Sequence, residues 1–183
     1  KIKRFAFSNS SIKSFYIPSK LTVLEDGWLE GIFQIDKITV SPDNPRYSMY
    51  EDQFVIGKSS IEQENYDVLI FCSRSIEGKI QIPDFIEIIG PHAFENCDKI
   101  QQVEFSPDSK LRIIGKESFQ ASSITSIYIP PKVKIIDQKS FHKTYCLKKV
   151  DFDPDSLLEK ICNGAFSYCS IDNISLPSSL IEI

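Results

Sequence analysis

The chain of 183 residues lacks several features that mark common functional classes. It has two histidines, His92 and His142, and none of its five cysteines form a CxxC pair. No apolar run reaches the roughly 18–20 residues of a transmembrane helix. No basic cluster accompanies the net charge of −4. These absences argue against a zinc motif, a nucleic-acid partner and membrane insertion of this segment.

The cysteine content argues against a fold held by disulfides. The number of cysteines is odd, and they are spread along the chain as Cys72, Cys97, Cys146, Cys162 and Cys169. Free cysteines behave as small buried hydrophobes, so we expect most of them in the core. This content favours a reducing compartment without establishing one.

Short β-prone segments recur along the chain, each followed at once or one residue later by proline. From Ile80 onward they begin every 23 or 24 residues. Proline cannot donate to a sheet ladder, so it ends each strand at the same place. The segments are Phe15–Ile17, Ile38–Val40, Ile80–Ile82, Val103–Phe105, Ile127–Ile129, Val150–Phe152 and Ile174–Leu176.

A phenylalanine forms the second landmark of each unit and usually follows a small residue. It occurs at Phe7, Phe94, Phe119, Phe141 and Phe166, with Leu29 in its place once. An isoleucine pair lies between proline and phenylalanine in three units, as at Ile88-Ile89. A unit of this length cannot bury its own apolar face, so stacking must create a shared core. The pattern therefore predicts a solenoid with the phenylalanines as a buried spine.

Strand geometry predicts which side chains face solvent. In each three-residue segment the outer two residues point one way and the middle one points the other way. The predicted exposed face carries Tyr16, Thr39, Gln81, Glu104, Tyr128, Asp151 and Ser175, with Lys148 beside it. Seven strands would give a sheet about 29 Å wide, enough for the roughly 800 Å² per partner of a standard interface.

At these landmarks the chain resembles the BspA-type, or treponemal-type, leucine-rich repeat. The resemblance covers almost the whole chain and implies an α/β repeat solenoid: a right-handed coil, mostly β with short helical turns, whose parallel sheet has about seven strands. Proteins of this type are often displayed on microbial surfaces, where they act in adhesion. The resemblance thus implies a cell-surface or secreted protein-binding module, with a host matrix or cell-surface protein as partner.

The spacing breaks once, between Ser41 and Lys79, where the unit is too long. Two β-prone runs, Gln53–Ile56 and Asp67–Phe71, predict a β-hairpin inserted at 41–79 within a single array of residues 1–183. The segment Asp43–Ser48 (DNPRYS) is similar to one that precedes such inserts in BspA-type arrays. We expect the insert to pack beside the solenoid as a flap. Its tyrosines, Tyr47, Tyr50 and Tyr66, would pack against apolar surface or contact a ligand.

Both termini fall within a repeat unit. Residues 1–7 match the end of a unit, and residues 180–183 stop before an expected small residue and phenylalanine. We therefore expect a longer array, or ends that pack against another surface. Leu180 and Ile183 would then favour end-to-end contacts.

Candidate chemistry is sparse, and the sequence predicts no catalytic residue, metal site or cofactor. His142 and Cys146 lie four residues apart, but no third group supports a metal site or a nucleophile. Asp151, Asp153 and Asp155 resemble the start of a calcium loop, but Ser156 stands where the glycine is required. We interpret these aspartates as turn residues.

The remaining function classes are two kinds of binding module. Tyrosines among mixed charges suit protein recognition, and Tyr16 and Tyr128 are the candidate anchors. The alternative to a surface adhesion module is a cytoplasmic protein–protein interaction scaffold, which the free cysteines would suit. An enzyme is the least favoured class.

Overall fold

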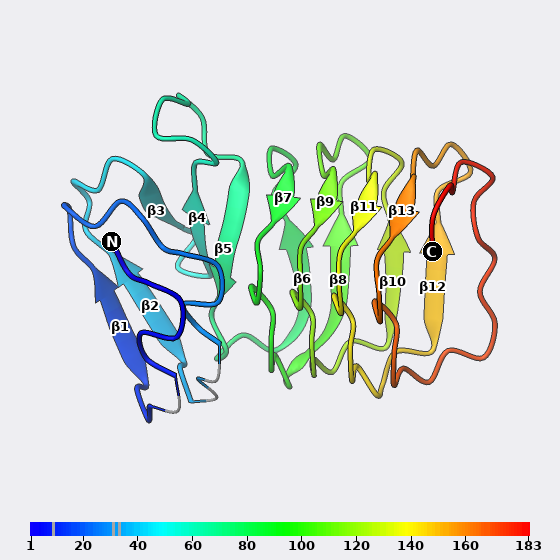
Figure 1. The fold of residues 1–183 in the computed structure, drawn as a ribbon, viewed down its shortest axis with the longest axis horizontal. Helices are drawn as coiled ribbons and strands as arrows, with labels where there is room; N and C mark the ends of the chain where they lie inside the picture. Colours follow the sequence, from blue (N-terminus) through cyan, green and yellow to red (C-terminus); the bar gives the residue numbers. More distant parts are fainter. Residues whose placement is uncertain (9, 31, 33) are drawn as a thin grey trace.

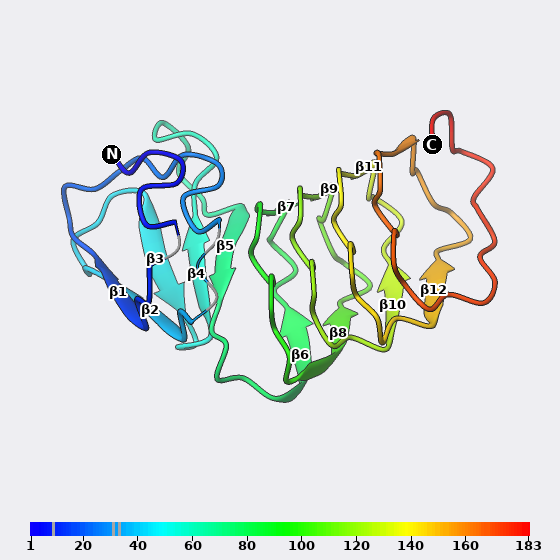
Figure 2. The ribbon, with the colours of Figure 1, turned by 60° about the horizontal axis from the view of Figure 1, so that its bottom comes forward.

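The chain winds into coils that stack side by side along one axis (Figures 1 and 2). The computed structural model describes residues 1–8, 10–30, 32 and 34–183. The predicted class, a repeat solenoid with parallel strands, is confirmed. The predicted short helical turns are wrong, because no described residue lies in a helix.

The first wall of the solenoid consists of the proline-terminated strands. Six of the seven predicted segments lie in strands: β1 (Ser14–Ile17), β2 (Lys37–Val40), β6 (Gly78–Ile82), β8 (Ile100–Phe105), β10 (Ser126–Ile129) and β12 (Lys149–Phe152). They form two parallel sheets, β1-β2 and β6-β8-β10-β12, so the single seven-stranded sheet was a wrong prediction. The seventh segment, Ile174–Leu176, forms no strand. Within this chain it has a neighbouring coil on one side only, and Ile174 and Leu176 are exposed.

The second wall consists of two-residue strands, three of which are formed by the isoleucine pairs. They are β7 (Ile88–Ile89), β9 (Ile113–Ile114), β11 (Ile135–Ile136) and β13 (Lys160–Ile161), all paired in parallel. Gly115 follows β9 at a close approach between coils, where a β-carbon would overlap the carbonyl oxygen of Ile89. The glycine after the pair therefore serves packing between coils.

The third wall is a ladder of turns around the phenylalanines. For Phe94, Phe119, Phe141 and Phe166, backbone φ is positive two residues before the phenylalanine and two residues after it, at His92, Glu117, Lys139, Gly164, Asn96, Ala121, Lys143 and Tyr168. This alternation of handedness prevents a helix from propagating and turns amide groups toward the next coil. The N–H of Phe94 donates to Ser118 O at 2.6 Å, and that of Phe119 donates to Ser140 O at 2.7 Å. Hydrogen bonds between coils thus replace the predicted helical turns.

The phenylalanine spine is confirmed from Phe94 to Phe166, whereas Phe7 is half-buried and packs against Phe15 instead. Phe94, Phe119 and Phe141 are fully buried. Their rings, with that of Phe166, stack nearly parallel, with centroids 4.7, 5.1 and 5.1 Å apart and interplanar angles of 7° or less. Phe54, from the interrupted region, continues the spine edge-on to Phe94 at 6.3 Å. Leu29 is also buried, as its place in the repeat predicts.

The interrupted region contains the predicted antiparallel hairpin and a third strand that the sequence did not predict. The three strands are β3 (Tyr47–Tyr50), β4 (Phe54–Gly57) and β5 (Val68–Cys72). β5 pairs in parallel with β7, so the three strands extend the second wall into a seven-stranded sheet. Figure 2 shows them in line with the coils, between β1-β2 and β7, and not as a lateral flap.

The three inserted strands form a partition with a hydrophobic core on each face. Phe54, Ile56 and Leu69 belong to the core of the C-terminal coils. Val55 and Phe71 belong to a separate core around Trp28 and Ile38 in the N-terminal coils. A sheet covered on both faces requires continuous apolar runs, which explains FVIG in β4 and VLIFC in β5.

The buried ring stack yields the first prediction. Phe119→Ala removes a ring packed between two others, and we expect the free energy of unfolding to fall by about 3–5 kcal/mol. Phe5→Ala is the matched control, because Phe5 is 50% exposed, and it should cost about 0.5 kcal/mol. Urea denaturation of both variants measures the difference. Equal losses would contradict the role of the spine.

Candidate functional site

The outward face of β6, β8, β10 and β12 gathers four of the predicted surface residues into one row. Gln81 lies opposite Glu104, and Tyr128 lies opposite Asp151. The pairing of Val103 with Ile127 places Glu104 beside Tyr128. The residues at the inward positions are buried, namely Ile80, Val103, Ile127 and Val150. Strand alternation therefore directs the row away from the core.

The other four predicted residues lie apart from this row. Tyr16 and Thr39 are opposite each other on the separate sheet of β1 and β2. Lys148 is exposed and directly precedes β12, at the edge of the row. Ser175 is exposed but belongs to no strand. The structure thus divides the predicted face where the inserted partition separates β2 from β6 (Figure 2).

Ion pairs cover much of the row, and one tyrosine is fixed within it. Lys79 pairs with Glu104 at 2.5 Å, and Lys149 pairs with Asp151 at 2.6 Å. The hydroxyl of Tyr128 donates to the Asp153 carboxylate. This hydrogen bond raises the pKa of Tyr128 to about 12, so the phenol is neutral at physiological pH. The ring is 44% exposed and is held in one orientation.

The size of the row limits what it can bind alone. Four strands span about 14 Å and each is about 15 Å long, a flat area of about 200 Å². That is roughly a quarter of what each partner contributes to a standard interface of about 800 Å² per side. A partner on this face must therefore also contact the turns at its edges, where Lys148 and Asp153 lie.

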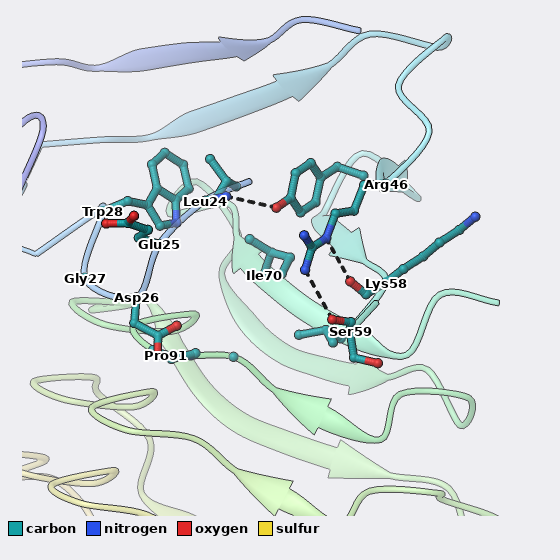
Figure 3. A pocket seen from close by; sticks show the side chains of 13 residues that line it. Leu24, Glu25, Asp26, Gly27, Trp28, Arg46, Lys58, Ser59, Ile70 and Pro91 are labelled. Atoms are coloured by element: carbon teal, nitrogen blue, oxygen red, sulfur yellow. Dashed lines mark hydrogen bonds between the residues drawn. The ribbon is translucent and has the colours of Figure 1, made fainter. Parts of the chain in front are cut away.

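A second candidate site is a cavity of about 150 Å³ where three parts of the chain meet. Leu24 and Trp28 come from the N-terminal coils, Tyr47 and Ile70 from the partition, and Pro91 from the next coil. In Figure 3 the acidic residues Glu25 and Asp26 lie on one side and the basic residues Arg46 and Lys58 on the other. Sequence reasoning missed this cavity, because its walls come from segments that no repeat or motif connects.

The DNPRYS segment holds one side of this cavity in place. The buried side chain of Asn44 donates to the carbonyls of Pro18 and Leu21 at 2.8 and 2.9 Å. Its oxygen accepts from the amides of Arg46 and Tyr47 at 2.9 and 2.8 Å. Asn44 thereby ties the insert to the N-terminal coils.

The arginine and tyrosines of the insert also have mainly packing roles. The Arg46 guanidinium donates to three carbonyls, those of Thr22, Lys58 and Ser59. Tyr47 is buried in the N-terminal core, and its hydroxyl accepts from the Leu24 amide at 3.1 Å. Tyr50 and Tyr66 are half-buried against the C-terminal core.

The residues considered for catalysis and metal binding have other partners. Nδ1 of His142 is hydrogen-bonded to the hydroxyl of Ser167 at 2.6 Å, and burial together with Lys143 and Lys139 lowers the pKa of His142. Asp153 accepts from the amide of Asp155 at 2.8 Å, as in a turn. Across the described ranges, no three His, Cys, Asp or Glu side chains gather closely enough to hold a metal ion. Nor does the described chain include a helix with the length and apolar character needed to cross a bilayer.

Comparison with known proteins identifies the repeat. Residues 1–63 and 68–183 match the family described as the BspA type leucine rich repeat region, in six copies. A search of curated proteins finds no matching sequence.

Solved structures of bacterial proteins share the fold. The chain is similar to a leucine rich cell surface protein of Faecalibacterium prausnitzii A2-165, with a TM-score of 0.61 and 22% identity over 92% of this chain and 48% of that one. The pneumococcal vaccine antigen PcpA has a TM-score of 0.69 and 14% identity, over 97% and 47%. A leucine-rich repeat protein of Eubacterium ventriosum has a TM-score of 0.64 and 16% identity, over 97% and 59%. The chain therefore spans about half the length of these proteins.

The contacts of Asn44 generate a prediction about the junction. Asn44→Ala leaves two carbonyls and two amides without their partner, so we expect the free energy of unfolding to fall by about 2 kcal/mol or more. Trp28 is the only tryptophan and lines the cavity, so its fluorescence should shift to longer wavelength. Asn65→Ala, at an exposed position of the same insert, is the control and should change neither quantity. An unchanged Trp28 spectrum in Asn44→Ala would show that Asn44 does not hold the junction.

Proposed function

This chain belongs to the BspA-type leucine-rich repeat family, and on that premise we propose that it is a non-enzymatic protein-binding module whose contact surface is the outward face of β6, β8, β10 and β12. The observation that carries the proposal is the row of Gln81, Glu104, Tyr128 and Asp151. Its inward neighbours are buried, whereas no segment of the described chain covers the row itself (Figures 1 and 2). A flat, uncovered sheet face suits a folded partner.

The chemistry of the face favours a protein over other partners. Acidic and basic side chains alternate and neutralise each other in pairs, so the face offers no concentrated positive field for nucleic acid. Tyrosine is enriched among the residues that dominate protein interfaces. The orientation of Tyr128 is already set by Asp153, which reduces the entropy lost when a partner covers the ring.

The edge of the face and the separate β1-β2 sheet provide the remaining contact area. Lys148 and the turn at Asp153 extend the row at β12. Tyr16, which is 56% exposed, offers a second aromatic contact on β1. A partner large enough to span the partition would contact both tyrosines.

The proposed setting is the surface of a microbial cell or its surroundings, with a host matrix or cell-surface protein as partner. The family resemblance supports this setting, as does the similarity in fold to a protein described as a leucine rich cell surface protein. A cytoplasmic interaction scaffold is the alternative. Labelling intact cells with an antibody against the chain distinguishes the two locations.

Tyr128→Ala tests the proposed face. We expect it to weaken binding to a responsive member of a panel of purified extracellular-matrix proteins by about tenfold, which corresponds to about 1.4 kcal/mol. Its stability should change little, because the ring is exposed. Affinity is measured on a biosensor surface, and thermal unfolding checks the fold. Tyr145→Ala is the matched control, because Tyr145 is 61% exposed but lies outside the strands.

The affinities of the two variants show whether the partner binds the outward face that carries Tyr128. Loss of affinity in Tyr128→Ala but not in Tyr145→Ala supports the face. Equal affinity of Tyr128→Ala and the unmodified protein for a bound matrix protein would exclude it. If no matrix protein binds the unmodified chain, the proposed partner class is wrong.

A further inference from the structure

Two buried thiols meet where the partition joins the next coil. Cys72 ends β5, and Cys97 lies in the turn that follows Phe94 in the spine. Their side chains are fully buried, with 0% and 2% exposure, and the two thiols are close enough to shift each other's pKa. The Cys72 thiol also donates to the carbonyl of Ser73 at 3.6 Å. The Cys72 amide also donates to the carbonyl of Ala93 at 2.9 Å, which holds the two segments together.

A fixed arginine contacts this thiol pair. Nη1 of Arg74 lies 3.0 Å from the sulfur of Cys97. The same nitrogen donates to the carbonyls of Cys72 and Ala93 at 3.0 and 2.8 Å. Nη2 donates to the carbonyl of His92 at 3.2 Å, and the guanidinium lies 4.6 Å from the ring centre of Phe71. These contacts fix the cation against Cys97.

The charge of Arg74 is compensated by backbone carbonyls, as that of Arg46 is, and in addition by one sulfur. Among the described residues, no carboxylate lies within 4.0 Å of Arg74 to form a salt bridge, as the ion pairs found elsewhere in the chain do. Removing a charge from water is costly unless an opposite charge or hydrogen bonds compensate. Among the groups that accept hydrogen bonds from Arg74, the thiol of Cys97 is the one that can become negative. The carboxylates of Asp36 and Asp98 line the adjacent hollow.

The environment assigns different roles to the two thiols. Burial and the nearby Asp98 carboxylate oppose ionisation of Cys97, but the neighbouring Cys72 thiol and the charge of Arg74 outweigh them and lower the pKa of Cys97 to about 7. Burial and the neighbouring Cys97 thiol raise the pKa of Cys72 well above its ordinary value. Because the thiolate is the nucleophile, Cys97 reacts first and Cys72 resolves the product.

A surface hollow lies beside this place. Its volume is about 400 Å³, and it is lined by Asp36, Arg74, Ser75, Asn96, Asp98 and Lys99. Asn96 and Asp98 flank Cys97 in the chain, and Arg74 both lines the hollow and contacts the sulfur. A displacement of this one half-buried side chain would admit a molecule as small as hydrogen peroxide.

We propose that Cys72 and Cys97 form a peroxide-reactive thiol pair that closes to a disulfide. The Cys97 thiolate attacks one oxygen of the peroxide, the O–O bond breaks, and the leaving hydroxide takes a proton to become water. Cys97 is then a sulfenic acid. The sulfur of Cys72 attacks that of Cys97, the S–O bond breaks, and the thiol proton of Cys72 leaves with the hydroxide as a second water. The two thiols supply the two electrons that reduce the peroxide.

The disulfide would link the partition covalently to the first coil beyond it. Cross-links stabilise mainly by restricting the unfolded chain, so the oxidised protein should resist unfolding more than the reduced one. This inference concerns the core where the partition meets the next coil, and it does not rest on the proposed binding function.

The test uses the full chain with Cys146→Ser, which removes the exposed thiol that could link two molecules. After treatment with dilute hydrogen peroxide, we expect an intact mass lower by two hydrogens and a peptide in which Cys72 is bonded to Cys97. Cys72→Ser should stop at a sulfenic acid that a dimedone reagent captures on Cys97. The melting temperature of the oxidised protein should rise by about 5 °C or more.

Substitutions of Arg74 test whether Cys72 and Cys97 are a reactive pair or only pack in the core. Arg74→Met should slow the reaction at pH 7 by about tenfold or more, because less of Cys97 is ionised, and Arg74→Lys should restore part of the rate. The peptide map of the unmodified protein needs no variant, so the test survives if a variant does not fold. The proposal is overturned if peroxide produces no bond between Cys72 and Cys97, or if Arg74→Met reacts as fast as the unmodified protein.

Discussion

The spacing between hydrogen-bonded coils is the constraint on which the rest of the molecule depends. Neighbouring strands lie about 4.8 Å apart, and the stacked phenylalanine rings lie 4.7–5.1 Å apart. A ring from each coil can stack on the next only because both distances agree. In all three walls, hydrogen bonds join neighbouring coils at this spacing. The phenylalanine of each coil must therefore lie directly beside that of the next coil. From Ile80 onward, the phenylalanines accordingly recur every 22 or 25 residues, and the strands of the first wall every 23 or 24.

The inserted strands obey the same constraint and thereby define the candidate surface. β5 pairs in parallel with β7, as the strands of neighbouring coils in the second wall do. Phe54 continues the ring stack. On the first wall, however, no inserted strand bridges β2 and β6. The array thus remains continuous in its core and second wall while its outward face is divided. The size of the surface offered to a partner follows from this division.

Residues in periodic positions could be predicted from the sequence, and residues brought together by folding could not. Val103, Phe119 and Tyr128 occupy repeated places, so strand alternation and the repeat predicted which are buried and which face outward. The pair Ile88-Ile89 was visible, but two residues are too short to identify a strand. Tyr47–Tyr50 lacks a clear alternation, so the third inserted strand was missed. Arg74 and Cys97 come from different segments, and no local pattern connects them.

The partition changes how the two halves of the array are coupled. In most solenoids each repeat contacts only its neighbours, and an irregular unit is a natural place for the array to divide. Here β4 and β5 supply side chains to the cores on both sides. Detaching either half would expose one apolar face of the same sheet to water. The irregular unit should therefore be where cooperativity is strongest, so that the halves melt together as one unit.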